Sequence, residues 1–278
     1  MTTRTQSEQQ TSGGGHTETA EESSVRSTRD TDGNSDSDGD PLVTANEVDF
    51  AYGAVSVLEG VSVAIRPARI TALIGPNGVG KTTLLQALAG LTDPSGGSIT
   101  YHGPDTVRHI GYLPQNPAFR PGFSALETLE FYASLVGETD PHARLERVGL
   151  EAAADRRVEA LSGGMTQLLG IAQATIGDPP LVALDEPASG LDPGMTTHVF
   201  DVAADLAATG TAVLLTSHDL DLVERTADEV ILLDDGGVAD QGSPSALLDR
   251  YEADSLWETY EAALTGDLHT VRVRGDSS

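Results

Sequence analysis

One short stretch of the chain carries residue types that suit phosphate binding. Residues 75–82 read Gly-Pro-Asn-Gly-Val-Gly-Lys-Thr and fit the pattern G-x-x-x-x-G-K-[ST], whose backbone N–H groups surround nucleotide phosphates. A mostly apolar run, residues 71–74, precedes the stretch, and leucines follow it at helical spacing. A loop between a strand and a helix offers anions the unpaired N–H groups of the helix N-terminus. We therefore expect Lys81 to contact the β- and γ-phosphates and the Thr82 hydroxyl to bind Mg²⁺.

The lysine in this stretch is unusual within the chain. Lys81 is the only lysine, and the other 15 basic residues are all arginine. A compact ammonium on a flexible stem suits a phosphate loop, and a planar guanidinium does not replace it. The same observation excludes a GTPase, because the base-reading motif N-K-x-D needs a second lysine.

A second candidate site lies where an apolar run meets two acids. Residues 181–184 read Leu-Val-Ala-Leu and are followed directly by Asp185 and Glu186. If this run is a strand of a parallel sheet, both acids lie at its carboxyl edge, beside the phosphate loop. Asp185 would then orient Mg²⁺, directly or through water, and Glu186 would act as the general base that polarises the attacking water.

These side chains can meet only if their elements form one sheet. Short, nearly continuous apolar runs are typical of parallel strands covered on both faces, and they occur at residues 70–74, 181–184, 211–216 and 230–233. Less buried strands are expected at residues 42–52, 57–65, 97–102 and 107–113. Helices are expected from the phosphate loop to about Gly90, over much of 124–160, from 164 to about 176, and near 244–251 and 254–264. One more helix should start at the N-cap Asp192, with Pro193 in its first turn, and end at Gly210.

The composition narrows the class of protein. The 278 residues include no cysteine, so disulfides and thiolate metal sites are excluded. The net charge of −27 repels nucleic acids and anionic lipids, and we expect no nucleic-acid partner. Residues 1–40 are polar and acid-rich, and we expect a disordered tail there. The sequence has no run of about 18 apolar residues and no secretory signal. These two observations predict a soluble, cytoplasmic protein.

Further motifs give the chain a resemblance to a known family. They occur in order as Tyr52, the phosphate loop, Gln115, Leu161-Ser162-Gly163-Gly164, Asp185-Glu186, Ser189-Gly190-Leu191-Asp192 and His218. Over about residues 42–254 the chain resembles an ABC ATPase. The resemblance implies an α/β fold, a P-loop NTPase cassette with a RecA-like mixed or parallel sheet core. It also implies an antiparallel β subdomain and a helical signature subdomain at about 117–178, all within a domain of residues 41–265. Residues 266–278 would be a flexible tail.

The resemblance also implies roles for single residues. Tyr52 would stack on adenine, Gln115 would reach Mg²⁺ and the attacking water, and His218 would contact the γ-phosphate. Asp192 would communicate between two nucleotide sites. The implied ATP-binding residues within the phosphate loop and just after it are Gly75, Pro76, Asn77, Gly78, Val79, Gly80, Lys81, Thr82 and Thr83. Ser162, Gly163 and Gly164 would grip the γ-phosphate of an ATP bound to the opposite subunit.

Some positions depart from the commonest family pattern. Met165 stands where glutamine is frequent, Leu168 where arginine is usual, and Ala188 where threonine or serine is usual. Leu168 removes one charge contact. The Met165 form resembles the branch that serves small six-helix permeases, whose cargo includes drugs, polysaccharides and the parts of copper enzymes.

The function implied by the resemblance is an ATP-binding and ATP-hydrolysing subunit of an ABC transporter. Two cassettes, as a homodimer or with a different second cassette, would enclose two ATP and move separate integral membrane permease subunits. The chain would lie at the inner face of the cell membrane. Residues 117–139, with Phe119, Phe123 and Tyr132, would dock a permease helix, or these aromatics would only fill the helical core.

Other ATPase classes give alternatives. Chromosome-organising relatives need long coiled coils, and translation-factor relatives carry two cassettes and basic surfaces; neither pattern is present. The alternative that stays open is a soluble ABC ATPase that acts as an assembly scaffold for iron–sulfur clusters, without a permease.

The acid-rich and lysine-poor composition predicts adaptation to high salt. Molar salt shortens the distance over which like charges repel, so the folded state should be favoured in KCl. We expect the protein to lose its far-ultraviolet circular dichroism in low salt and to retain it in molar KCl. Equal unfolding midpoints at both salt concentrations would contradict a halophilic origin.

Overall fold

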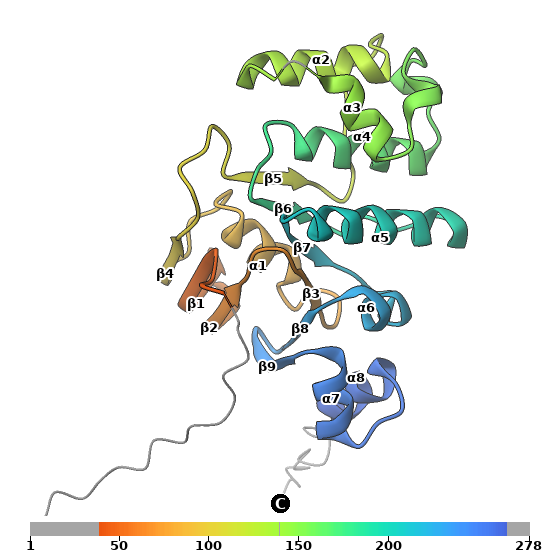
Figure 1. Cartoon of the computed structure of the whole chain (residues 1–278). Coiled ribbons are helices and arrows are strands. Elements are labelled where there is room, and N and C mark those ends of the chain that lie inside the picture. Colours follow the sequence, from red (N-terminus) through yellow and green to blue (C-terminus); the bar gives the residue numbers. More distant parts are fainter. Residues whose placement is uncertain (1–38, 139, 266–278) are drawn as a thin grey trace, which may run out of the picture. The chain divides into compact units, whose positions relative to one another are not determined.

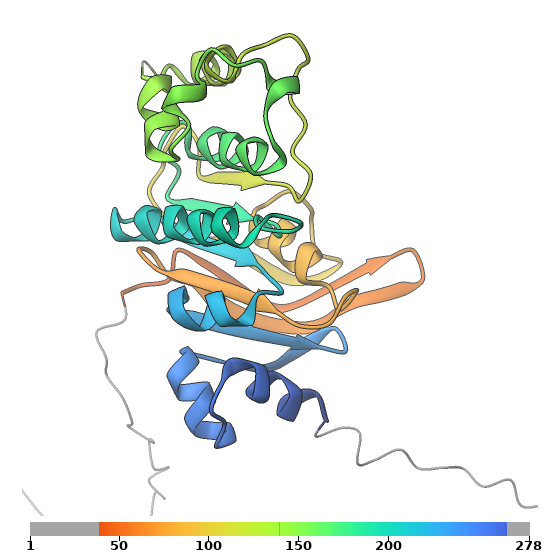
Figure 2. The same cartoon turned by 90° about the vertical axis from the view of Figure 1, so that its right-hand side faces the viewer.

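The computed structural model describes residues 39–138 and 140–265, which belong to one unit of α-helices and β-strands (Figures 1 and 2). The predicted disordered segment, residues 1–40, lies outside the described residues except for its last two positions. The predicted flexible end, residues 266–278, lies outside them as well.

A six-stranded sheet forms the centre of the described unit. Its strand order is β5-β6-β7-β3-β8-β9, and all neighbours are parallel except β9, which is antiparallel to β8. The bounds are β3 (Ile70–Ile74), β5 (Ile110–Leu113), β6 (Leu181–Leu184), β7 (Ala212–Thr216), β8 (Glu229–Asp234) and β9 (Gly237–Gly242). The four predicted parallel strands are therefore confirmed. β9 was not predicted, because it has few apolar residues and depends on its pairing with β8.

The strand predicted at residues 107–113 begins only at Ile110. Arg108 instead donates hydrogen bonds to the carbonyl oxygens of Gln173 at 3.0 Å and Ile176 at 3.2 Å. These carbonyls lie at the end of α4 (Gly163–Thr175), where the regular helical hydrogen bonds run out; the Gln173 carbonyl also accepts from the Ile176 N–H at 3.3 Å. The side chain of Arg108 thus satisfies a helix terminus, and the strand starts after it.

The central sheet buries a different core on each of its faces. Ile70, Ala72 and Ile74 of β3 pack into one core together with α4, α5 (Pro193–Ala208) and α6 (Leu220–Thr226). Leu73, from the same strand, packs into the other core with α1 (Lys81–Leu88). Side chains alternate across a strand, so a strand that is covered on both faces is apolar along its whole length.

A three-stranded antiparallel sheet covers the second core. Its order is β2-β1-β4, with β1 (Val43–Tyr52), β2 (Val55–Ile65) and β4 (Gly96–Tyr101). The three strands agree with the predicted ranges to within two residues. Helix α1 contacts β1 and β2 on one side and β3 and β7 on the other, so it lies between the two sheets.

Helices gather at both ends of the central sheet (Figure 1). Beyond β5 lie α2 (Ala125–Val136), α3 (Pro141–Arg147), α4 and the short 3₁₀ turns η1 (Glu151–Ala153) and η2 (Val158–Ala160). Near β9 lie α7 (Pro244–Tyr251) and α8 (Leu256–Thr265). Within α2, Leu129 is buried and Leu135 is 67% exposed.

Two helix starts show how local sequence sets the boundaries. Ser124 caps α2 and forms a capping box with Glu127. Asp192 caps α5, with Pro193 in the first turn, as predicted.

Helix α6 was not predicted; it has seven residues and is capped by Asp219. Within residues 39–138 and 140–265, no helix combines the length and apolar character that crossing a membrane requires.

An ion-pair network joins the helices beyond β5. Arg144 of α3 contacts Glu138, after α2, at 2.7 Å and Asp178, after α4, at 2.9 Å. The side chains of Arg144 and Glu138 are only 11% and 12% exposed, and Glu138 also accepts a hydrogen bond from the Gly177 N–H at 2.7 Å. One guanidinium therefore holds the ends of α2 and α4 to α3.

Replacing Arg144 by Met should destabilise the protein because it leaves Glu138 largely buried without its cation. We expect the free energy of unfolding in urea to fall by about 3 kcal/mol. The matched control is Arg225→Met, because Arg225 is exposed and donates to the Asp221 carbonyl within its own helix. This control should change stability by less than about 0.5 kcal/mol. Equal losses in both variants would contradict the role of the network.

Candidate functional site

The sheet order brings three sequence motifs to one edge. β6, β7 and β3 are adjacent and parallel, so their carboxyl ends lie side by side. The phosphate loop follows β3, Asp185 follows β6, and His218 stands two residues after β7. Ligands of open α/β sheets bind outside such carboxyl ends. The three motifs thus face one potential ligand site.

The backbone of the phosphate loop is shaped by glycines. Gly75 has φ 150°, and a Cβ there would lie 2.4 Å from the carbonyl oxygen of Leu233. Gly80 has φ 106°, and a Cβ there would lie 2.7 Å from Leu58 Cδ2. Gly80 is also the N-cap of α1 and gives the helix no side-chain cap. The first N–H groups of α1 are therefore open to an anion.

Lys81 lies largely buried inside this loop. Its Nζ donates to the carbonyl oxygens of Gly75 at 2.8 Å and Pro76 at 3.0 Å, and the residue is 7% exposed. Burial lowers the pKa of Lys81, while the charges of Glu186 and Asp185 act in the opposite direction. An anion in the loop would favour the ammonium form further, because opposite charges stabilise each other.

Asp185 is the centre of a small oxygen cluster. Its Oδ1 accepts hydrogen bonds from the hydroxyls of Thr82 and Thr216, each at 2.9 Å, and the residue is 4% exposed. Carboxylate and hydroxyl oxygens are ligands that suit Mg²⁺. In the part of the chain that the structure describes, no group of three or more His, Asp or Glu could hold a metal. A cation at Asp185 and Thr82 would thus take further ligands from phosphates and water.

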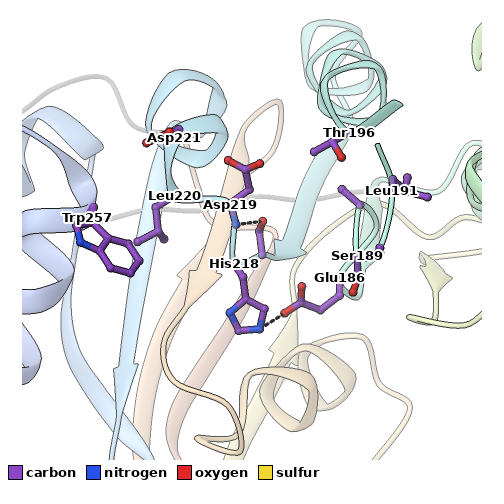
Figure 3. Close-up of a pocket in the computed structure, with 12 residues that line it drawn as sticks. Glu186, Ser189, Leu191, Thr196, His218, Asp219, Leu220, Asp221 and Trp257 are labelled. Atoms are coloured by element: carbon purple, nitrogen blue, oxygen red, sulfur yellow. Dashed lines mark hydrogen bonds and ion pairs between the residues drawn. The ribbon is translucent and has the colours of Figure 1, made fainter. Parts of the chain in front are cut away.

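Glu186 and His218 form a pair at the mouth of this cluster (Figure 3). The Oε1 of Glu186 lies 2.8 Å from the Nε2 of His218. Glu186 has φ 48°, a left-handed conformation that is uncommon for a side chain other than glycine, and its N–H donates to Thr216 Oγ1 at 2.7 Å. Burial raises the pKa of Glu186, and the charges of His218 and Lys81 partly oppose this. A raised pKa suits a group that accepts a proton.

Most of the predicted site residues line one cavity of about 330 Å³. The cavity brings the phosphate loop together with Tyr52, Gln115, Glu186 and His218. Tyr52 ends β1 and is 57% exposed, so it is a surface aromatic at the rim. The residues that line the cavity are Tyr52, Val57, Asn77, Gly78, Gly80, Lys81, Thr82, Thr83, Gln115, Glu186 and His218.

Residues 161–164, which we call the signature turn, form a separate group and do not line this cavity. Ser162 caps α4, and its Oγ accepts from the Met165 N–H at 3.3 Å. A Cβ on Gly164 would lie 2.4 Å from Met195 Cγ, so the turn packs closely on the start of α5. Asp192 caps α5 through the N–H groups of Gly194 and Met195, each at 3.1 Å.

The structure shows the surroundings of two residues that depart from the family pattern. Leu168 is 2% exposed and belongs to the core. The sulfur of Met165 accepts a hydrogen bond from Arg156 Nη1 at 3.7 Å.

The sequence did not reveal several residues that support the site. Thr216 binds Asp185 and Glu186, and its place at the end of an apolar run was the available signal. Gln167 Nε2 donates to the Gln115 carbonyl at 2.8 Å and holds that loop; nothing in the sequence pointed to it. Trp257 and Tyr260 of α8 line a cavity of about 370 Å³ with Gly75–Asn77, Ser217, His218 and Leu220. Only the fold brings α8 to this place.

Comparisons with known proteins agree with this geometry. Residues 58–189 match the family model of the ABC transporter. The chain is 34% identical to the Nod factor export ATP-binding protein I of Ralstonia nicotianae, over 75% of this chain and 69% of that protein. It is 35% identical to the zinc import ATP-binding protein ZnuC of Halorhodospira halophila, over 82% of this chain and 87% of that protein. A solved ATP-binding subunit of an ABC transporter superposes with a TM-score of 0.71 at 28% identity, covering 80% of this chain and 99% of that structure.

The open N–H groups of α1 and the buried Lys81 suit a triphosphate. The relatives are ATP-binding subunits of transporters. The chain therefore belongs to the ABC transporter ATP-binding family and is an ATPase subunit of an ABC transporter.

Proposed function

We propose that two cassettes, either two copies of this chain or this chain and a second cassette, enclose two ATP molecules. The observation that carries the proposal is the separation of the site into two groups. Most of the phosphate loop, Glu186 and His218 line one cavity, and the signature turn lies outside it. The N-terminus of α4, capped by Ser162, could complete a site only by approaching the phosphates of another subunit.

Within one subunit, each side chain has a task that follows from its position. Lys81 leaves the carbonyls of Gly75 and Pro76 and binds the β- and γ-phosphates. Glu186 accepts a proton from the attacking water, and Gln115 and His218 orient the water and the γ-phosphate. Tyr52, exposed at the rim of the cavity, stacks on adenine.

Mg²⁺ fits the oxygen cluster around Asp185. Thr82 and Asp185 would hold it, with Gln115 as a further ligand, and the bound cation would neutralise charge on the phosphates. Thr216 keeps Asp185 in place, because its hydroxyl donates to the carboxylate.

The membrane partner follows from the family. The named relatives serve an exporter and an importer, so the ATPase chain is compatible with either direction and the permease decides it. These relatives favour a transporter subunit over an iron–sulfur assembly scaffold. We place the protein at the inner face of the cell membrane, held there by permease subunits.

The helices beyond β5 offer a surface for the permease. Phe119 and Phe123 are partly exposed in the segment before α2, and the Arg120 guanidinium lies 4.9 Å from the Phe123 ring centroid. Phe119 and Tyr132 also pack partly against the core. We propose that Phe119 and Phe123 contact a short permease helix, which fits its apolar face into a groove.

Glu186→Gln should trap the dimer. The amide cannot accept a proton from water but retains the size of the carboxylate, so the variant should bind ATP and hydrolyse it at least about 100-fold more slowly. With ATP and Mg²⁺, gel filtration should show a dimer, and without nucleotide a monomer. A variant that binds ATP and stays monomeric at all protein concentrations would contradict the sandwich.

Phe119→Ala with Phe123→Ala should uncouple ATP hydrolysis from transport. Both residues lie outside the phosphate-loop cavity, so the isolated chain should bind and hydrolyse ATP at the normal rate. Transport by the reconstituted complex should fall by about tenfold or more, because truncating central interface aromatics costs over 1 kcal/mol. Lost ATP binding in the isolated chain would count against a docking surface.

A further inference from the structure

Helix α8 presents an aromatic face to the nucleotide-binding residues. Trp257, Tyr260 and Leu264 are spaced by three and four positions, so they share one side of the helix. Trp257 and Tyr260 line a cavity with the first residues of the phosphate loop and His218. Leu264 lines a neighbouring cavity with Pro76–Val79. None of these residues belongs to a family motif quoted above.

The neighbouring side of α8 is fixed to the element that follows His218. Leu256 is fully buried, Thr259 is 1% exposed, and the Leu256 N–H donates to Glu224 Oε2 of α6 at 2.7 Å. Helix α6 is capped by Asp219, the residue after His218. Because α8 is anchored in this way, the place of Trp257 relative to His218 is set by the fold.

Trp257 is itself poorly covered. It is 53% exposed and forms one wall of a cavity of about 660 Å³, whose other walls are Glu186, residues 188–191, Thr196 and residues 217–221. Figure 3 shows Trp257 and Glu186 on opposite sides of His218. An exposed tryptophan at the edge of a functional cavity is typical of an interface, where tryptophan is enriched among the residues that carry binding energy.

The same cavity has a projecting loop as a second wall. Ser189 and Gly190 are exposed, and with Leu191 they line the hollow opposite Trp257. In a two-fold symmetric dimer, the same surface of each subunit faces the other subunit. A loop on each copy can therefore enter the hollow of the other copy. A second copy would place its own loop, residues 189–191, into this hollow and receive the first copy's loop in return.

We propose that Trp257 is the anchor of the contact between two copies of this chain, and that it packs on residues 189–191 of the second copy. The proposal rests on the ATP sandwich and adds to that dimer a contact residue, Trp257, that lies outside the known motifs. It also gives α8 a function, since the helix holds Trp257 beside His218.

Charge favours an apolar anchor at this place. The hollow carries the acids Glu186, Asp219 and Asp221, whereas residues 189–191 are Ser-Gly-Leu and uncharged. An ion pair between the loop and the hollow is therefore unavailable, and contact of Leu191 with the indole supplies the apolar part of the attraction. Salt should not weaken such a contact, because it screens only the repulsion between the acids of the two copies.

The test compares dimers formed in the Glu186→Gln background with ATP and Mg²⁺. Trp257→Ala should raise the dimer dissociation constant, measured by sedimentation or gel filtration over a range of concentrations, by about 30-fold or more. ATP and Mg²⁺ should be held at saturating concentrations for each variant, so that the comparison reports only the affinity of the two copies for each other. The matched control is Leu91→Ala, because Leu91 is 52% exposed and lies after α1, outside this cavity; its dimer should be as tight as that of the parent.

A second measurement needs no change at Trp257, which is the only tryptophan. In the Glu186→Gln protein, dimer formation should shift its fluorescence to shorter wavelength and reduce quenching by acrylamide, in step with protein concentration at saturating ATP. An unchanged dissociation constant in Trp257→Ala, or an indole equally quenched in the dimer, would overturn the anchor and leave the sandwich standing. A parent that never dimerises would overturn both.

Discussion

The structure depends on the parallel pairing of β6, β7 and β3. Backbone hydrogen bonds hold neighbouring strands about 4.8 Å apart, so the ends of these strands, distant in the sequence, meet at one edge. The measurable result is the pair of 2.9 Å contacts that Asp185 makes with Thr82 and Thr216. A slip of one residue in β6 would turn Asp185 to the other face of the sheet. Such a slip is unfavourable because it would take the buried Asp185 carboxylate away from the hydroxyls of Thr82 and Thr216.

The electrostatics of the site oppose those of the whole chain. A protein with net charge −27 needs positive groups at the place where it binds a highly charged anion. Lys81 is the only lysine, and the start of α1 adds open N–H groups. Asp185 and Glu186 stand beside Lys81 and stabilise its ammonium form against the cost of burial. These acids in turn repel phosphate, and the proposed Mg²⁺ would offset this repulsion.

The groups expected to face a second subunit are packed together within the first. The signature turn contacts α5 where Gly164 meets Met195, and the same stretch of backbone is capped by Asp192. Movement of the helices beyond β5 would thus reach both the signature turn and the start of α5. The network around Arg144 links the ends of α2 and α4 to α3. Helix α8 adds a fixed aromatic surface on the other side of His218.

The sequence alone determined the elements and the chemistry, because these depend on local patterns. Buried strands appeared as apolar runs, the glycines and Lys81 defined the phosphate loop, and Asp192 marked the start of α5. It could not predict β9 or α6, since the first is supported by pairing with β8 and the second has seven residues.

Only the tertiary structure decided which of these groups meet. Gln167 supports the Gln115 loop across two elements, and Trp257 reaches His218 through the packing of α8 on α6. Such contacts join residues far apart in the chain and leave no local periodicity. The same reason explains why the signature turn was identified from its residues, while its exclusion from the phosphate-loop cavity became visible only in the fold.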